Sequence, residues 1–455
     1  MAAALSVCAK PESQGVRHDA SADGIFAAGF TTTPLWWSEA PLAPADGAAL
    51  PERVEVAVIG TGYCGLSCAL ELARAGTQVA ALDAGALGAG ASTRNGGMVG
   101  GAVKLDGQDL ARRFGRERAA ALESGARASF DHLESLIARE RLDAAYERCG
   151  RFVVACNPRQ YRRLERQVGA LGERVGGVRL VPRARQREEI GSDLYHGGVA
   201  IEAAGGLHPA RFHRGLRVAA ARAGAGLHGH AGVRRIGREA GRFVLETARG
   251  PLRADALVVA TNGYTGPLTP TLQRRVIPVS SYIIATEELP PELTRRLSPK
   301  GRMFVDGNRL LSYFRLSPDR RRVLFGGRVS LADVDERRSA AGLYRRLVAV
   351  WPELTGCRLT HSWKGSLAFT FDRLPHMGER DGAHFAMGCN GSGVAMASYL
   401  GHQIALKLLG RTNRPCPFDG LDFPTHPLYH GRPWFLPAIS VWYRWRDAVD
   451  GWPSR

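Results

Sequence analysis

The sequence of 455 residues contains no run of 18 apolar residues, so nothing in it predicts a membrane-spanning helix. Its eight cysteines form no C-x-x-C pair, which is typical of reduced thiols and not of a disulfide framework or a zinc site. The first ten residues lack the basic start and the small-residue cleavage site of a secretory signal. We therefore expect a cytoplasmic protein that binds no metal.

Lysine is also scarce, since only five of the 61 basic residues are lysine and the rest are arginine. There are 43 acidic residues, and the net charge of +18 favours anionic ligands or partners, nucleic acid among them. The basic residues are nevertheless scattered in small groups, and no nucleic-acid-binding motif accompanies them. A solvated basic surface is the favoured interpretation, and nucleic acid is not an expected partner.

Residues 1–50 are expected to form an arm, because they are rich in Ala, Pro, Gly and Ser. Only the Pro-Leu-Trp-Trp segment at 34–37 is apolar enough to dock on the body of the protein. We expect the first ten or twenty residues to be mobile.

A strand–helix–strand unit follows the arm. Residues 54–59 and 77–82 are short apolar runs, and residues 65–75 between them have helical periodicity. This order predicts two parallel strands joined by a crossover helix.

The turn that joins the first strand to the helix reads G-x-G-x-x-G, and its candidate binding residues are Gly60, Gly62, Tyr63, Cys64 and Gly65. In a dinucleotide site the first glycine makes the turn, the second admits the pyrophosphate and the third lets the helix pack closely. The helix N-terminus then faces the anion. Asp83 ends the second strand with Ala84 beside it, where a carboxylate can bind the ribose hydroxyls.

Two more glycine-rich segments favour flavin over nicotinamide. Residues 88–98 form a polar loop directly after Asp83, long enough to pass the pyrophosphate and reach an isoalloxazine ring. Residues 388–394 follow another apolar strand and open another helix. The backbone amides there could face the edge of a flavin on which negative charge develops.

These segments resemble the FAD-dependent amine and amino-acid oxidoreductases of the D-amino-acid-oxidase type. The resemblance also uses Leu-His-Pro at 207–209, Ala-Thr-Asn-Gly-Tyr at 260–264, and Trp-x-Gly at 363–365 with the motif at 372–378. The branch that the sequence resembles most is the gamma-glutamylputrescine oxidoreductase group, through 34–37, 313–319 and 325–328.

The resemblance implies an α/β fold with a discontinuous Rossmann-like FAD-binding domain and an antiparallel-sheet α+β substrate domain. It assigns 51–145, 205–265 and 371–412 to the FAD domain, 146–204 and 266–370 to the substrate domain, and 413–455 to a C-terminal tail. Motif and resemblance together assign to FAD the residues Gly60, Gly62, Tyr63, Cys64, Gly65, Asp83, Ala84, Ser92, Arg94, Asn95, Gly96, Gly97, Met98, Val233, Thr261, Gly388, Asn390, Gly391, Gly393 and Val394. Relatives of the sarcosine-oxidase kind attach flavin through a cysteine where Gly365 stands here, so non-covalent FAD is expected.

Few side chains are needed for the expected chemistry, because the flavin accepts the hydride and the protein supplies orientation and electrostatics. Arg315 is expected to hold a substrate carboxylate, with a surface salt bridge as the alternative. Lys364 is expected to stabilise reduced flavin or superoxide, with an exposed lysine as the alternative. Candidate aromatic walls are Tyr264, Tyr282, Tyr313, Trp363 and Phe369, each with core packing as the alternative. His208 is interpreted as a helix-start residue and not as a base.

The sequence thus predicts an FAD enzyme that oxidises a C–N bond of an amine or amino acid, with O₂ or a carrier taking the electrons. A gamma-glutamylputrescine-like substrate fits the resemblance. Two alternatives stay open: an FAD-linked dehydrogenase of an N-methyl amino acid, and a flavin-containing nucleic-acid-binding or regulatory protein.

Overall fold

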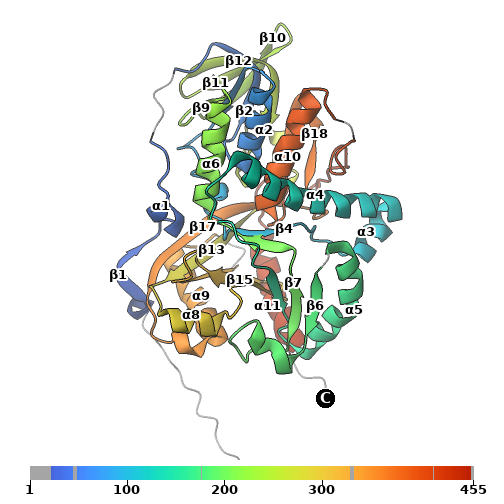
Figure 1. Ribbon diagram of the computed structural model, residues 1–455. Coiled ribbons are helices and arrows are strands. Elements are labelled where there is room, and N and C mark those ends of the chain that lie inside the picture. Colours follow the sequence, from blue (N-terminus) through green and yellow to red (C-terminus); the bar gives the residue numbers. More distant parts are fainter. Residues whose placement is uncertain (1–21, 45–48, 176, 328–332, 413, 452–455) are drawn as a thin grey trace, which may run out of the picture.

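Two large β-sheets share the chain in interleaved segments (Figure 1). The computed structural model describes residues 22–44, 49–175, 177–327, 333–412 and 414–451. The start of the arm, expected to be mobile, lies outside these residues, as does Arg328 of one family motif. The expected α/β class and the discontinuous Rossmann-like domain are confirmed, whereas the domain boundaries stay a prediction.

The first sheet contains the strand–helix–strand unit. Its path is β10–β11–β12–β2–β3–β9, with β19 beside β12 and β18 beside β19. The pairs that join β2, β3, β9, β12 and β19 are parallel, and these strands are largely buried, which explains their apolar runs. The strands are β2 Arg53–Ile59, β3 Val79–Leu82, β9 Gly226–His228, β10 Val233–Glu239, β11 Arg242–Thr247, β12 Gly250–Val259, β18 His376–Arg380 and β19 Ala383–Met387.

A group of helices packs together beside this sheet: α2 (Tyr63–Arg74), α4 (Arg116–Glu140), α6 (Pro209–Arg222) and α10 (Gly393–Leu408). Another helix, α3 (Gly107–Phe114), precedes α4, and Gly115 with φ +78° separates the two. His208 caps α6, and its Nδ1 accepts a hydrogen bond from the backbone N–H of Arg211 at 3.2 Å. The helix-start interpretation of His208 is therefore confirmed.

The second sheet has nine strands in the order β1–β17–β13–β16–β15–β14–β5–β7–β6. Most of its pairs are antiparallel as expected, but β1–β17 and β14–β5 are parallel. Its strands are β1 Phe26–Thr31, β5 Arg151–Val154, β6 Val178–Val181, β7 Gly198–Ile201, β13 Val276–Thr286, β14 Met303–Asp306, β15 Ser312–Leu316, β16 Val323–Gly327 and β17 Leu359–Thr370. The arm thus contributes a strand to this sheet, which its composition did not predict.

Helices α5 (Pro158–Val175), α8 (Pro291–Leu297) and α9 (Glu336–Val350) accompany the second sheet, and short β4 (Met98–Gly100) pairs with β8 (Ala204–Gly206) between the two sheets (Figure 1). Two short helices, α1 (Leu35–Glu39) and α7 (Pro270–Gln273), complete the body. The tail contains α11 (Leu436–Gly451), which the sequence pattern did not predict.

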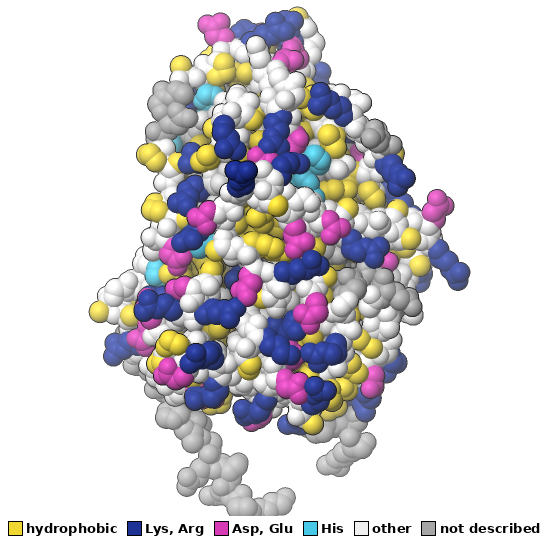
Figure 2. Space-filling view, in the orientation of Figure 1, with side chains coloured by type: hydrophobic (Ala, Val, Ile, Leu, Met, Phe, Trp, Pro, Cys, Tyr) yellow, Lys and Arg dark blue, Asp and Glu magenta, His cyan; other side chains and the backbone are white. Residues whose placement is uncertain are grey.

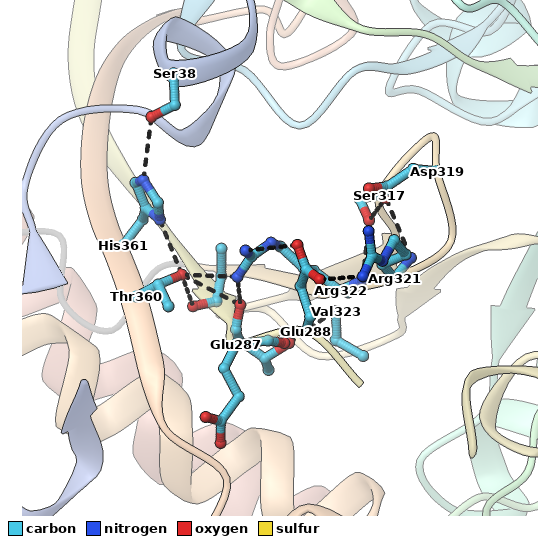
Figure 3. Close-up of polar contacts among 12 residues, drawn as sticks. Ser38, Glu287, Glu288, Ser317, Asp319, Arg321, Arg322, Val323, Thr360 and His361 are labelled. Atoms are coloured by element: carbon cyan, nitrogen blue, oxygen red, sulfur yellow. Dashed lines mark hydrogen bonds and ion pairs between the residues drawn. The ribbon is translucent and has the colours of Figure 1, made fainter. Parts of the chain in front are cut away.

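A polar network ties the arm to the second sheet (Figure 3). Arg322 at the end of the β15–β16 turn donates to Thr360 Oγ1 at 3.3 Å and pairs with Glu288. His361 contacts Thr360 Oγ1 at 2.9 Å and, through its other ring nitrogen, Ser38 Oγ at 3.4 Å. The ring of His361 is neutral at physiological pH, because burial lowers its pKa to about 4.

The surface carries basic side chains dispersed among acidic ones over the face in Figure 2. The described residues form many exposed ion pairs, such as Arg53 with Asp255 and Arg187 with Asp193. Within the described part of the chain, no helix is long and apolar enough to cross a bilayer.

Candidate active site

The G-x-G-x-x-G turn is built for close backbone contacts. Gly60 has φ +104°, and a Cβ there would lie 2.9 Å from the carbonyl oxygen of Ala260. A Cβ on Gly65 would lie 1.8 Å from the carbonyl oxygen of Gly60, so only glycine lets α2 start this close to β2. Gly62 is the N-cap of α2, and a Cβ on it would meet Ser92 Oγ at 2.9 Å.

Asp83 closes the same turn from the end of β3. One carboxylate oxygen accepts hydrogen bonds from the N–H of Thr61 at 3.0 Å and from its hydroxyl at 2.6 Å. Beyond it, Ala84 packs against Gly232, where a Cβ would lie 3.2 Å from Ala84 Cα, and Val233 opens β10. The carboxylate therefore stands directly after β3, where a Rossmann unit binds a ribose.

His213 supports the turn from α6, and sequence reasoning missed it. Its Nε2 lies 2.8 Å from the carbonyl oxygen of Thr61, and its ring lies against Gly88. Burial lowers the pKa of His213 to about 4, so the ring is neutral at pH 7 and donates this hydrogen bond from Nε2.

Three indole groups hold the loop that precedes β4. They are Trp36, which donates to Asn95 O at 2.8 Å, Trp37, which donates to Thr93 Oγ1 at 2.9 Å, and Trp363, which donates to Arg94 O at 2.8 Å. The loop also braces itself, because the side chain of Asn95 donates to Ser92 O at 2.9 Å and accepts from Gly97 N at 2.8 Å. The docking segment of the arm therefore positions the polar glycine-rich loop directly.

The segment that precedes α10 is equally constrained. Gly388 donates its N–H to the side chain of Asn262 at 2.9 Å, directly after Thr261 at the end of β12. Asn390 is buried with φ +50°, and its side-chain oxygen accepts from Thr370 N at 3.0 Å. The backbone from 388 to the N-terminus of α10 at Gly393 is thereby held against both sheets.

A cavity joins these two glycine-rich segments to the second sheet. Its empty space, the open mouth included, is about 1240 Å³. The lining comprises Tyr63, Ala91, Ser92, Arg94, Asn95, Gly96, Met98, Gly100, Lys104, Arg151, Asn262, Ser281, Val305, Leu311, Tyr313, Gly365, Ser366, Leu367, Ala368, Cys389, Gly391, Ser392, Gly393, Val394 and Ala397. Three of these described residues are cationic and none is acidic, so the cavity favours anionic groups.

The predicted cofactor residues divide into two groups. Those that line the cavity are Tyr63, Ser92, Arg94, Asn95, Gly96, Met98, Gly391, Gly393 and Val394. The others surround the turn, the end of β3 or the cavity wall: Gly60, Gly62, Cys64, Gly65, Asp83, Ala84, Gly97, Val233, Thr261, Gly388 and Asn390. This division matches a long ligand that runs from the end of β3, past the N-terminus of α2, into the cavity.

Of the predicted catalytic residues, only Tyr313 lines the cavity. Its hydroxyl lies 3.0 Å from Ser281 Oγ, and its ring faces Gly96, where a Cβ would lie 3.0 Å away. Of the other proposed aromatic walls, Tyr282 and Trp363 are fully buried in the core, Tyr264 is exposed, and Phe369 packs in a separate cluster. Core packing, the stated alternative, describes Tyr282 and Trp363.

Arg315 does not reach the cavity lining. It is buried, and its guanidinium donates to three backbone carbonyls, those of Leu316 at 2.9 Å and of Gly97 and Leu207 at 3.1 Å. These contacts tie β15 to the loop before β4 and to the start of α6. In this geometry Arg315 cross-links these segments, and its expected role as a substrate clamp stays a prediction.

Lys364 points away from the cavity as well. Its ammonium donates to both carboxylate oxygens of Asp333, at 3.0 and 3.1 Å, and lies 3.9 Å from Glu336. The neighbouring residue on β17, Gly365, lines the cavity instead, as do Ser366, Leu367 and Ala368 after it. The contacts of Lys364 are those of a partly exposed ion pair.

Two positions bear on how a flavin would be held. Gly365 puts no side chain into the cavity wall, and a Cβ there would lie only 3.2 Å from Arg94 Cβ. Cys389 lines the cavity, and burial raises the pKa of its thiol to about 12, which keeps it protonated. The glycine cradle, the carboxylate of Asp83 and the long cavity with its cationic lining together fit a flavin dinucleotide.

Comparison with known proteins gives a consistent result. A family model described as DAO, FAD dependent oxidoreductase, matches residues 55–406. The chain is 33% identical to a probable oxidoreductase OrdL of Rhizobium meliloti, over 87% of this chain and 92% of that protein. It is 32% identical to the gamma-glutamylputrescine oxidoreductase of Escherichia coli, over 87% and 93% of the two chains. The crystal structure of glycine oxidase from Geobacillus kaustophilus superposes with a TM-score of 0.70 at 23% identity, covering 83% of this chain and 99% of that one.

Proposed function

Since the chain belongs to the DAO family of FAD-dependent oxidoreductases, we propose that it oxidises the C–N bond of a primary amine, with gamma-glutamylputrescine as the first compound to test. The protein is an FAD-dependent oxidoreductase of the amine or amino-acid type. The observation that carries the proposal is the cavity, which joins both glycine-rich segments to the sheet that bears Tyr313.

The lining favours a neutral amine. An ammonium group would meet cations and no carboxylate among the described lining residues, and nearby positive charge lowers the pKa of an amine. A neutral nitrogen has the lone pair that assists loss of hydride from the adjacent carbon. Bound FAD supplies the acceptor of that hydride.

The other parts of the site would bind FAD and orient the substrate. The N-terminus of α2 and the turn around Gly62 would hold the pyrophosphate, and Asp83 would hold the ribose. Tyr313, with its hydroxyl on Ser281, would form the wall against which the substrate packs. Loss of hydride from the neutral primary amine leaves a protonated imine, which water hydrolyses to an aldehyde and an ammonium ion.

Absorbance spectroscopy of the purified protein tests this proposal. We expect a flavin spectrum, release of all yellow colour into the supernatant on acid precipitation, and anaerobic bleaching by gamma-glutamylputrescine. Colour that stays in the pellet would contradict non-covalent binding. A protein that no amine or amino acid bleaches would contradict the reaction. Admission of air to the bleached protein then distinguishes an oxidase, which regains its colour, from a dehydrogenase that needs another acceptor.

A further inference from the structure

Arg151 lies in the cavity wall, and no acidic residue in the described part of the chain pairs with it. It is the first residue of β5, and its guanidinium lies over β4, where Nη2 donates to Val99 O at 3.3 Å. Its Nε is buried and has no hydrogen-bond partner in the described part of the protein. Among those same residues, none forms an ion pair with Arg151 within 4.0 Å.

This position is unusual for a charged group. A guanidinium stays protonated even where burial lowers its pKa, as it does for Arg151. A desolvated charge without a counter-ion is costly, and proteins normally pair it. Because the side chain of Arg151 lines the cavity and none of the described acidic residues pairs with it, an anion that enters the cavity can supply the missing counter-charge.

The other cations near the cavity are placed differently. Arg94 donates from Nε to Ala89 O at 2.8 Å and from Nη1 to Lys364 O at 3.3 Å, and it stacks on Trp37. Lys104 lies opposite Gly391, at the entrance to α10. Arg151 instead shares the wall made by the second sheet with Val305 and Tyr313.

We propose that Arg151 binds a carboxylate of the substrate, so that the enzyme selects amines that also carry a carboxylate. The planar guanidinium can donate two parallel hydrogen bonds to such a group, which a lysine cannot. Arg151 takes over the role expected of Arg315, whose donors are used by backbone carbonyls. This inference rests on the proposed function.

The test compares each amine with its own carboxamide. Three pairs suffice: gamma-glutamylputrescine, sarcosine and glycine, each with the analogue in which the carboxylate is an amide. We expect wild-type kcat/KM for flavin reduction to favour the carboxylate form of the best pair by about 30-fold or more, the usual effect of a buried charged contact. Arg151→Met should remove that preference, and Arg151→Lys should restore only part of it.

Two controls keep the result interpretable. Arg345→Met removes one exposed charge on α9 and should leave the preference unchanged. Binding of glutarate, which has no amine to oxidise, should perturb the flavin absorbance of wild type and of Arg345→Met but not of Arg151→Met. Flavin absorbance and circular dichroism report whether each variant folds and holds FAD.

The outcomes separate the two proposals. If Arg151→Met keeps the full carboxylate preference, the inference is wrong and the reaction stands. If Arg151→Met and Arg151→Lys both lose FAD while staying folded, the residue serves the cofactor and the inference is equally wrong. If wild type bleaches with no compound yet binds glutarate through Arg151, the proposed function fails and the anion site remains.

Discussion

The indole nitrogen of Trp36, in the arm, donates a hydrogen bond to the carbonyl oxygen of Asn95 at 2.8 Å. Trp36 is fully buried, and Asn95 lies in the cavity wall. A segment that precedes the whole Rossmann unit in sequence thus sets the shape of the loop that faces the proposed flavin.

Trp36→Phe should therefore weaken FAD binding. The substitution keeps an aromatic ring but leaves a partly buried carbonyl without its donor, which costs about 1–3 kcal/mol. We expect the dissociation constant of FAD, measured by flavin fluorescence on titration of the apoprotein, to rise roughly tenfold. Trp434→Phe, which alters an indole that is 66% exposed, is the control and should change nothing. A loss of thermal stability with unchanged FAD affinity would limit the arm to a structural role.

Gly62→Val should abolish FAD binding while the protein stays folded. A side chain there meets Ser92 Oγ and occupies the approach to the N-terminus of α2. Gly29→Val on β1 is the matched control, because a Cβ at Gly29 meets no atom within 4 Å. If Gly62→Val binds a full complement of FAD, the pyrophosphate does not bind at this turn.

Arg315→Met should destabilise the protein without changing which substrates it prefers. The substitution leaves the carbonyls of Gly97, Leu207 and Leu316 without a charged donor, and we expect a loss of about 2–4 kcal/mol in the free energy of unfolding. Lys364→Met, which breaks the partly exposed pair with Asp333, should cost no more than about 1 kcal/mol. Urea denaturation measures both. If Arg315→Met loses activity on carboxylated substrates only, Arg315 is the substrate clamp that the sequence predicted.

Acidification should destabilise the protein through His213. The folded state holds this ring neutral down to a pKa of about 4, whereas the unfolded chain protonates it near its ordinary value of 6.5. Between these values the unfolded state binds more protons, so stability is complete above pH 6.5 and falls as the pH drops toward 4. We expect His213 to contribute on the order of 2 kcal/mol to the loss between pH 7 and pH 5. Urea denaturation at the two pH values should give a smaller difference for His213→Leu than for wild type, while His430→Gln, an exposed control, keeps the wild-type difference.

The fold was readable from sequence where the signal is local. The run 54–59, the glycine turn and the helix after it are contiguous, and β2, the turn and α2 occupy those residues. The branch-specific segment 34–37 likewise predicted a docking contact, and Trp36 is buried.

The site was less readable, because it depends on which side of a strand faces inward. Lys364 and Gly365 are adjacent, yet the glycine lines the cavity and the lysine pairs with Asp333, a difference that their places in the sequence do not reveal. Tyr313 and Arg315 share a face of β15, yet Arg315 ends beneath Gly97 and Leu207, which the sequence does not place there. Arg151 was missed because, in so arginine-rich a chain, one more arginine at the start of a strand carries no distinguishing signal.

The interleaving of the two sheets has a consequence for synthesis. β1, at Phe26–Thr31, pairs with β17 at Leu359–Thr370, and β12 in the first sheet pairs with β19 at Ala383–Met387. A nascent chain therefore cannot complete either sheet until most of its length has left the ribosome, and its early strands wait with open edges that favour aggregation. Because FAD binds a site made from both the earliest and the latest of these segments, its availability during translation should raise the yield of folded protein, by capturing the native pairing as soon as it forms.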